Sequence, residues 1–153
     1  MANEYCSLTD VQNEYKNAPT FDSASKPTST AVETKITRYS RKMDSVLNKA
    51  YSVPITESAS PNAYMVLTEI CLLMVRSWLD PLLGISAKID PDTDEPINMM
   101  KSAMDELNLL VENNSLDDAV LKTSSGITDW NSANNIKPTL DPDTYSIKDK
   151  DWW

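Results

Sequence analysis

The sequence predicts an all-α protein, a small bundle of about four helices followed by an extended C-terminal arm. In two long stretches, apolar residues recur at alternating steps of three and four, which is the spacing of one face of an α-helix. Proline and serine interrupt the chain between the predicted helices. From Lys122 onward the chain has neither a helical nor an alternating period. We therefore expect a helical core over residues 1–121 and an arm over residues 122–153.

The first two helices are predicted over residues 8–16 and 31–51, separated by a loop rich in proline, serine and threonine. Thr9 and Thr30 are expected to be their N-caps, because a threonine hydroxyl accepts a hydrogen bond from a free backbone N–H at a helix start. In each case Gln or Glu stands three residues further on, at the capping-box position. The second helix has one apolar stripe that faces a partner helix, formed by Val32, Ile36, Tyr39, Met43, Val46 and Ala50.

The third helix is predicted over residues 61–80, with Ser60 as N-cap and Pro61 at its first position. This stretch is apolar on nearly every side, which indicates a central helix that packs against several neighbours. Pro81 and Gly84 are expected to end it, because proline lacks a backbone N–H and glycine readily leaves the helical conformation.

The fourth helix is predicted over residues 96–112, with Pro96 at its first position. Asp94 and Glu95 precede it and are expected to cap it, because carboxylates complement the partial positive charge of a helix N-terminus. Its apolar residues again follow steps of three and four, at Ile97, Met100, Met104, Leu107 and Val111.

The composition excludes most catalytic and metal-binding chemistry. Histidine is absent, which removes the commonest general base and metal ligand, and two glycines cannot build a Gly-rich phosphate loop. Asp90, Asp92 and Asp94 have the spacing of a calcium loop, but Glu95 and Lys101 stand where such a loop needs glycine and glutamate. We predict no enzyme activity, no catalytic residue, no cofactor and no metal site.

The two cysteines, Cys6 and Cys71, fit no metal motif and do not make a disulfide framework. Cys71 stands in the most apolar stretch of the chain and is predicted to be a core residue. That stretch is too short and too charged for a membrane span, and the chain opens without a cationic leader. We therefore expect a soluble protein made in the cytoplasm.

The net charge of −9 argues against a general affinity for nucleic acid, and it is unevenly distributed. Residues 31–51 carry five basic and two acidic side chains, whereas residues 88–122 carry nine acidic and three basic ones. These stretches are either two solvated helix faces or the two sides of a head-to-tail contact between copies. The basic face comprises Lys35, Arg38, Arg41, Lys42 and Lys49. The acidic face, which meets a neighbouring subunit or faces a lumen, comprises Asp90, Asp92, Asp94, Glu95, Asp105 and Glu106.

The predicted arm contains three of the four tryptophans of the chain, although disordered tails normally lack aromatic residues. Fully extended, its residues could reach about 100 Å at roughly 3.3 Å per residue. The arm therefore either crosses a neighbouring subunit or folds back over its own bundle. Its predicted partner-binding anchors are Trp130, Ile136, Leu140, Tyr145, Ile147, Trp152 and Trp153.

Two short motifs stand at the start of the chain and at the end of the second predicted helix. Near the start, YCSLTDV places Tyr5 before the pair Asp10 and Val11. The second helix then runs into SVLNKAYSVPI, ahead of Pro61, and the matching residues are Asp44, Leu47, Tyr51, Val53 and Pro54. In these motifs the chain resembles the head–tail connector (adaptor) proteins of tailed bacteriophages, including the Mu-like prophage version, over roughly residues 4–112. It departs from them at NNSLDD, where many members have a Gly-containing turn, and the arm has no detailed match.

The resemblance implies a small helical subunit of the virion neck, made in the host cytoplasm. Copies form an oligomeric ring, usually of twelve, which docks on the portal protein and receives the next neck or tail protein. DNA passes through the lumen without specific binding during genome ejection, and no membrane is involved. An acidic lumen would repel phosphate and let DNA slide. The alternative is a small acidic helical adaptor protein outside any virion, which uses its arm as a tether.

Overall fold

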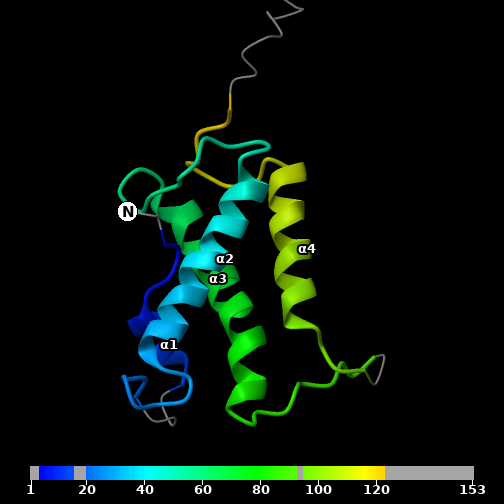
Figure 1. Cartoon of the computed structure of the whole chain (residues 1–153). Helices are drawn as coiled ribbons and strands as arrows, with labels where there is room; N and C mark the ends of the chain where they lie inside the picture. Colours follow the sequence, from blue (N-terminus) through cyan, green and yellow to red (C-terminus); the bar gives the residue numbers. More distant parts are fainter. Residues whose placement is uncertain (1–3, 16–19, 93–94, 123–153) are drawn as a thin grey trace, which may run out of the picture. The chain divides into compact units, whose positions relative to one another are not determined.

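The computed structural model describes residues 4–15, 20–92 and 95–122, and within them the chain forms four α-helices (Figure 1). These are α1 (Leu8–Glu14), α2 (Ser29–Leu47), α3 (Pro61–Leu82) and α4 (Met99–Glu112). The predicted all-α fold is confirmed. The chain divides into two units, Met1–Lys122 and Thr123–Trp153. The predicted arm and all its anchors lie beyond the described residues, so the arm stays a prediction.

α3 is the central helix, as its apolar sequence predicts, and it contacts each of the other three helices. Leu67, Met74 and Leu79 on this helix are fully buried. α2 adds Val32, Ile36, Met43 and Leu47, and α4 adds Ala103 and Leu107. Complete burial of a large apolar side chain stabilises a fold by about 1.5–3 kcal/mol, so the facing sides of α2, α3 and α4 provide most of the stability.

α1 is fastened to the bundle at both of its ends. Before the helix, Tyr5 is fully buried beneath α2 and α3. After it, the Tyr15 hydroxyl donates a hydrogen bond to the buried carboxylate of Asp80 in α3. Burial, followed by this hydrogen bond, raises the pKa of Tyr15 above its usual value. Beside it, Glu14 forms an ion pair with Arg76 at 3.3 Å.

The predicted N-caps of α1 and α2 are two residues too late. Ser7 caps α1: its hydroxyl accepts from the backbone N–H of Asp10, and the Asp10 carboxylate accepts from the Ser7 N–H at 2.7 Å. Ser7 and Asp10 therefore form the capping box that was predicted for Thr9 and Gln12. Thr28 caps α2 in place of Thr30. Thr9 and Thr30, the expected caps, lie inside the helices that begin at Leu8 and Ser29.

The two ends of α3 differ from the prediction in one respect each. Ser60 and Pro61 occupy the predicted positions, but the Ser60 hydroxyl makes no cap and instead donates to the backbone oxygen of Asp118 at 3.0 Å. At the other end Pro81 lies inside α3, because proline in a last turn forfeits only one hydrogen bond. Gly84, with φ of 70°, follows the helix.

The carboxylate of Asp118 caps α3 from a distance of 55 positions in the sequence. It accepts from the backbone N–H groups of Asn62 at 3.0 Å and Ala63 at 3.2 Å. Asp118 has φ of 58°, in the left-handed region that aspartate tolerates better than most residues. The loop after α4 thus supplies the N-cap that the sequence assigns to Ser60.

α4 begins three residues later than predicted. The Asn98 side chain accepts from the Lys101 N–H at 3.0 Å and is the N-cap. Residues 95–97 instead pair with residues 88–90, through Ile97 N–H to Lys88 O and Asp90 N–H to Glu95 O, both 2.8 Å. Glu95 therefore belongs to a turn and does not cap the helix, and Asp94 lies outside the described residues.

The segment after α4 returns to the bundle and packs beside the turn that ends α2. α2 stops at Leu47, four residues earlier than predicted, which lets Tyr51 turn into the core. The Tyr51 hydroxyl donates to Leu110 O at 3.2 Å and accepts from Leu116 N–H at 3.1 Å. The Lys122 N–H donates to Ala50 O at 2.7 Å, so the helical unit includes Lys122.

We expect the substitution Asp118→Ala to lower the free energy of unfolding by about 1–2 kcal/mol, because two N–H groups at the start of α3 lose their acceptor. Chemical denaturation measures this change. The matched control is Asp117→Ala, which removes the exposed neighbouring carboxylate and should change the value by less than about 0.5 kcal/mol. Equal effects of the two substitutions would show that the distant cap contributes nothing.

Candidate interaction surfaces

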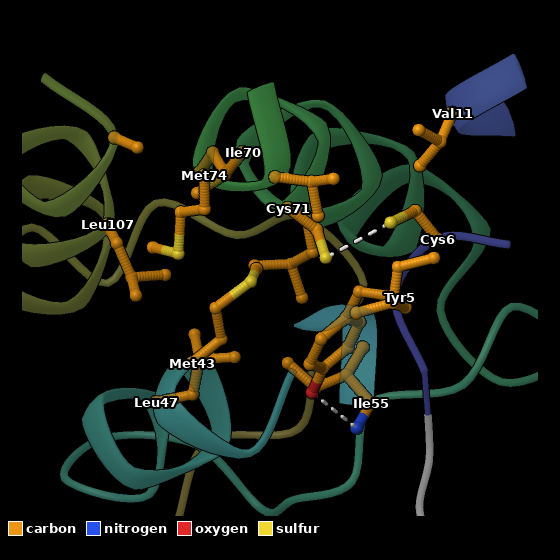
Figure 2. Close-up of a cluster of buried hydrophobic side chains, with 14 of the residues drawn as sticks. Tyr5, Cys6, Val11, Met43, Leu47, Ile55, Ile70, Cys71, Met74 and Leu107 are labelled. Carbon is orange, nitrogen blue, oxygen red and sulfur yellow. Dashed lines mark hydrogen bonds between the residues drawn. The ribbon is translucent and has the colours of Figure 1, made fainter. Parts of the chain in front are cut away.

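Four of the motif residues belong to the buried hydrophobic core, and Figure 2 shows three of them, Tyr5, Val11 and Leu47. Tyr5, Val11, Leu47 and Tyr51 are each fully buried. The Tyr5 hydroxyl donates to the Asp44 carboxylate at 2.5 Å and accepts from the Ile55 N–H at 3.4 Å. One tyrosine therefore joins the segment before α1, the helix α2 and the residue that follows the Val-Pro pair.

The backbone and carboxylate contacts around Tyr5 fix its position further. Its own backbone N–H donates to the hydroxyl of Ser40, a fully buried residue of α2, at 3.0 Å. Burial raises the pKa of the Asp44 carboxyl above its usual value, and the hydrogen bond from Tyr5 offsets part of that rise. The ionised carboxylate is thus held in a partly desolvated place, where its charge costs stability.

The basic face lies on α2 and the turn after it. Lys35, Arg38 and Lys42 are spaced by three and four residues, so they share one side of the helix. Arg38, Arg41, Lys42 and Lys49 are exposed. Within the described residues none of the five forms an ion pair. Lys35 is half-buried, with its ammonium 5.0 Å from the ring centre of Trp78 on α3, so it contributes packing as well as charge.

The structure brings only part of the acidic face together. Asp90, Glu95 and Asp105 line an open depression of about 390 Å³ between the α3–α4 loop and α4. Lys101 lines it too and lowers its net negative charge. Asp92 and Glu106 are exposed outside this depression. Asp90 also has a local structural role, since its carboxylate accepts from the Asp92 N–H at 2.9 Å.

A second acidic surface was not predicted. Glu4, Asp10, Glu57 and Glu69 line an open cleft of about 750 Å³ between the N-terminal segment and the first half of α3. We call it the acidic cleft. Its four carboxylates come from four separate segments of the chain, and each stands alone in its local sequence, so no motif or charge run marks them. Only the docking of the N-terminal segment on α3 assembles them.

The last turn of α3 and the α3–α4 loop expose large apolar side chains. Leu82, Ile85 and Ile89 are 55%, 45% and 61% exposed, and Ile97, predicted to lie on α4, is 37% exposed just before it. Ile85 and Ile97 line a small pocket of about 220 Å³ beside α3. Clustered exposed apolar residues on a small protein are typical of protein–protein contacts.

Among residues 4–15, 20–92 and 95–122, no cluster of three or more metal-binding side chains is found. None of the helices in this part of the chain is both long and apolar enough to cross a membrane. Comparison of the chain with protein-family models, curated proteins and solved structures finds no match. The connector resemblance therefore rests on the motifs named above.

We expect Asp44→Asn to stabilise the protein relative to the wild type increasingly as the pH rises. The raised pKa means that the stability contributed by protonated Asp44 is complete below its unfolded value of 3.8 and is lost as the pH rises through the folded value. Asparagine keeps the oxygen that accepts from Tyr5 and never ionises. Urea unfolding of both proteins between about pH 3.5 and 7 measures the difference.

The control for Asp44 is Asp105→Asn, at an exposed carboxylate on α4. This variant shows the effect of removing a surface carboxylate that has no contact with Tyr5. A difference for Asp44→Asn that is constant across the range, or that shrinks as the pH rises, would contradict a destabilising buried charge.

Proposed function

We propose that this protein is a structural subunit of a phage head–tail connector ring, which docks on the portal, lines the DNA conduit and receives the next neck or tail protein. The supporting observation is the Tyr5 cluster. Residues that match the family pattern, among them Tyr5, Asp44 and Tyr51, are linked by hydrogen bonds or buried in one core. Tyr5 and Asp44, which belong to different motifs of the pattern, thus form a direct hydrogen bond of 2.5 Å.

The distribution of charge fits contacts between copies in a ring. The basic face belongs to α2, whereas the acidic depression belongs to the α3–α4 loop and α4. Because the two surfaces lie on different elements, one copy can present its basic face to the acidic surface of the next. Such a heterologous contact closes into a ring when the rotation between copies allows it. Acidic residues left on the inner side would repel the phosphates of passing DNA.

The arm and the apolar loop offer two further contacts for such an assembly. The described unit ends at Lys122, and the 31 residues that follow include Trp130, Trp152 and Trp153. An arm that binds a neighbour adds a second attachment and raises the avidity of the ring. Leu82, Ile85 and Ile89 provide an exposed apolar surface for the portal or for the downstream protein.

Charge reversal tests the proposed contact between copies. We expect Arg38→Glu combined with Lys42→Glu to abolish rings formed on the portal, because the basic face then repels the acidic face. Adding Glu95→Lys and Asp105→Lys to the same chain restores complementarity and should restore the rings. Mass photometry with and without portal protein measures the assemblies. The control is Lys26→Glu, at an exposed residue of the loop before α2.

Three results would contradict the proposal. If the protein has the same oligomeric state with and without portal protein, it is a free adaptor protein. If rings still form when Arg38 and Lys42 are both replaced by Glu, the basic face is not part of the contact between copies. An assembled lumen lined by lysine and arginine excludes the acidic conduit. In the same assay, Trp152→Ala with Trp153→Ala tests whether the arm binds a neighbour, since unchanged assembly would remove that role.

A further inference from the structure

We infer that Cys6 and Cys71 are an oxidisable thiol pair that forms an intramolecular disulfide when hydrogen peroxide or a similar small, uncharged oxidant enters the acidic cleft. The two sulfur atoms lie 3.2 Å apart, although 65 positions separate the residues in the sequence (Figure 2). Cys6 belongs to the segment before α1, and Cys71 lies in the middle of α3. This inference does not depend on the proposed function.

The segment that carries Cys6 is held in place by contacts of the two residues that precede it. Tyr5 is hydrogen-bonded to Ser40 and Asp44, and the Tyr64 hydroxyl donates to Glu4 O at 2.7 Å. A disulfide requires sulfur atoms about 2.0 Å apart, so the thiols need to approach by only about 1 Å more. The sulfur atoms already face each other across the contact between the N-terminal segment and α3, so the bond can form at the place where the two thiols meet.

Access to the two sulfurs is unequal. Cys71 is fully buried, whereas Cys6 retains 3% exposure and lines the acidic cleft. An oxidant therefore meets Cys6 first. The carboxylates of Glu4, Asp10, Glu57 and Glu69 surround this entrance. They repel anionic oxidants such as glutathione disulfide and admit a small neutral molecule.

The chemistry balances in two steps. The Cys6 thiolate attacks hydrogen peroxide, its sulfur becomes a sulfenic acid and the O–O bond breaks with release of hydroxide. The Cys71 thiolate then attacks the Cys6 sulfur, forms the S–S bond and expels a second hydroxide. The two thiol protons convert both hydroxides to water. Two electrons pass from the sulfur atoms to the peroxide, and reduction by an external thiol reverses the change.

The electrostatics of the pair affect the rate of oxidation, whereas the order of attack follows from the access to Cys6. The hydrogen bond to Cys71, burial and the nearby carboxylates raise the pKa of Cys6, which makes its thiolate scarce and its oxidation slow at neutral pH and faster as the pH rises. The hydrogen bond from Cys6 lowers the pKa of Cys71 in the reduced pair, and this hydrogen bond is lost once Cys6 is oxidised. The product joins the N-terminal segment covalently to α3.

The test uses the full chain, fully reduced and then treated with hydrogen peroxide or with glutathione disulfide. Samples are denatured in N-ethylmaleimide, and intact mass and peptide mapping follow. We expect loss of both alkylation sites, a Cys6–Cys71 peptide and a reversible rise of the melting temperature by roughly 5–15 °C. The reaction should be faster at pH 8.5 than at pH 7, and at least tenfold faster with peroxide than with the disulfide at low salt.

Two variants separate the roles. Cys71→Ser should accumulate a Cys6 sulfenic acid that dimedone traps, whereas Cys6→Ser should leave Cys71 unmodified over the same period. If peroxide leaves both cysteines alkylatable in the wild-type chain, or joins two chains instead, the inference is wrong. Equal rates with peroxide and glutathione disulfide would overturn the selection of the oxidant by the acidic cleft. The wild-type result decides the matter even if a variant fails to fold.

Discussion

The buried hydroxyl of Tyr5 is the constraint on which the rest of the unit depends. A buried polar group needs hydrogen-bond partners, because leaving it unsatisfied costs about 1–3 kcal/mol. The Asp44 carboxylate and the Ile55 N–H meet that need only when the N-terminal segment lies in one register against α2 and α3. That register also places Cys6 against Cys71 and brings Glu4 and Asp10 to the acidic cleft. The core, the thiol pair and the cleft thus share one cause.

A second set of long-range contacts fixes the start of α3 and the segment after α4. α3 begins with Pro61 and lacks a side-chain cap of its own, so the carboxylate of Asp118 supplies one. Tyr51 joins α4 and the following segment to the turn after α2. Stability therefore depends on residues far apart in the sequence. The surfaces proposed to meet other copies lie on elements that these contacts hold in place.

The sequence predicted what local periodicity determines. The four helices and the central position of α3 follow from the spacing of apolar residues, and Cys71 was correctly assigned to the core. Of the stripe predicted for α2, Val32, Ile36 and Met43 are buried. Ser40 and Leu47 are buried where Tyr39 and Val46 were expected, and Ala50 lies beyond the helix. Helix ends were less predictable, because Ser7, Thr28 and Asn98 compete as caps with neighbours of similar chemistry. Four of the five residues of the basic face lie on α2, so their proximity follows from the sequence, while their contact with another copy stays a prediction. The acidic cleft and the Cys6–Cys71 contact could not, because they arise only when distant segments meet.

The stability of Tyr5 variants tests this account most directly. Urea unfolding should show that Tyr5→Phe lowers the free energy of unfolding by about 1–2 kcal/mol through the lost hydrogen bonds. Tyr5→Ala should lower it by about 3–5 kcal/mol, because a cavity is added. Tyr64→Phe, which removes a more exposed hydroxyl, is the matched control and should cost less than Tyr5→Phe. If Tyr5→Ala costs less than about 1 kcal/mol, the N-terminal segment does not belong to the core, and the central claim is wrong.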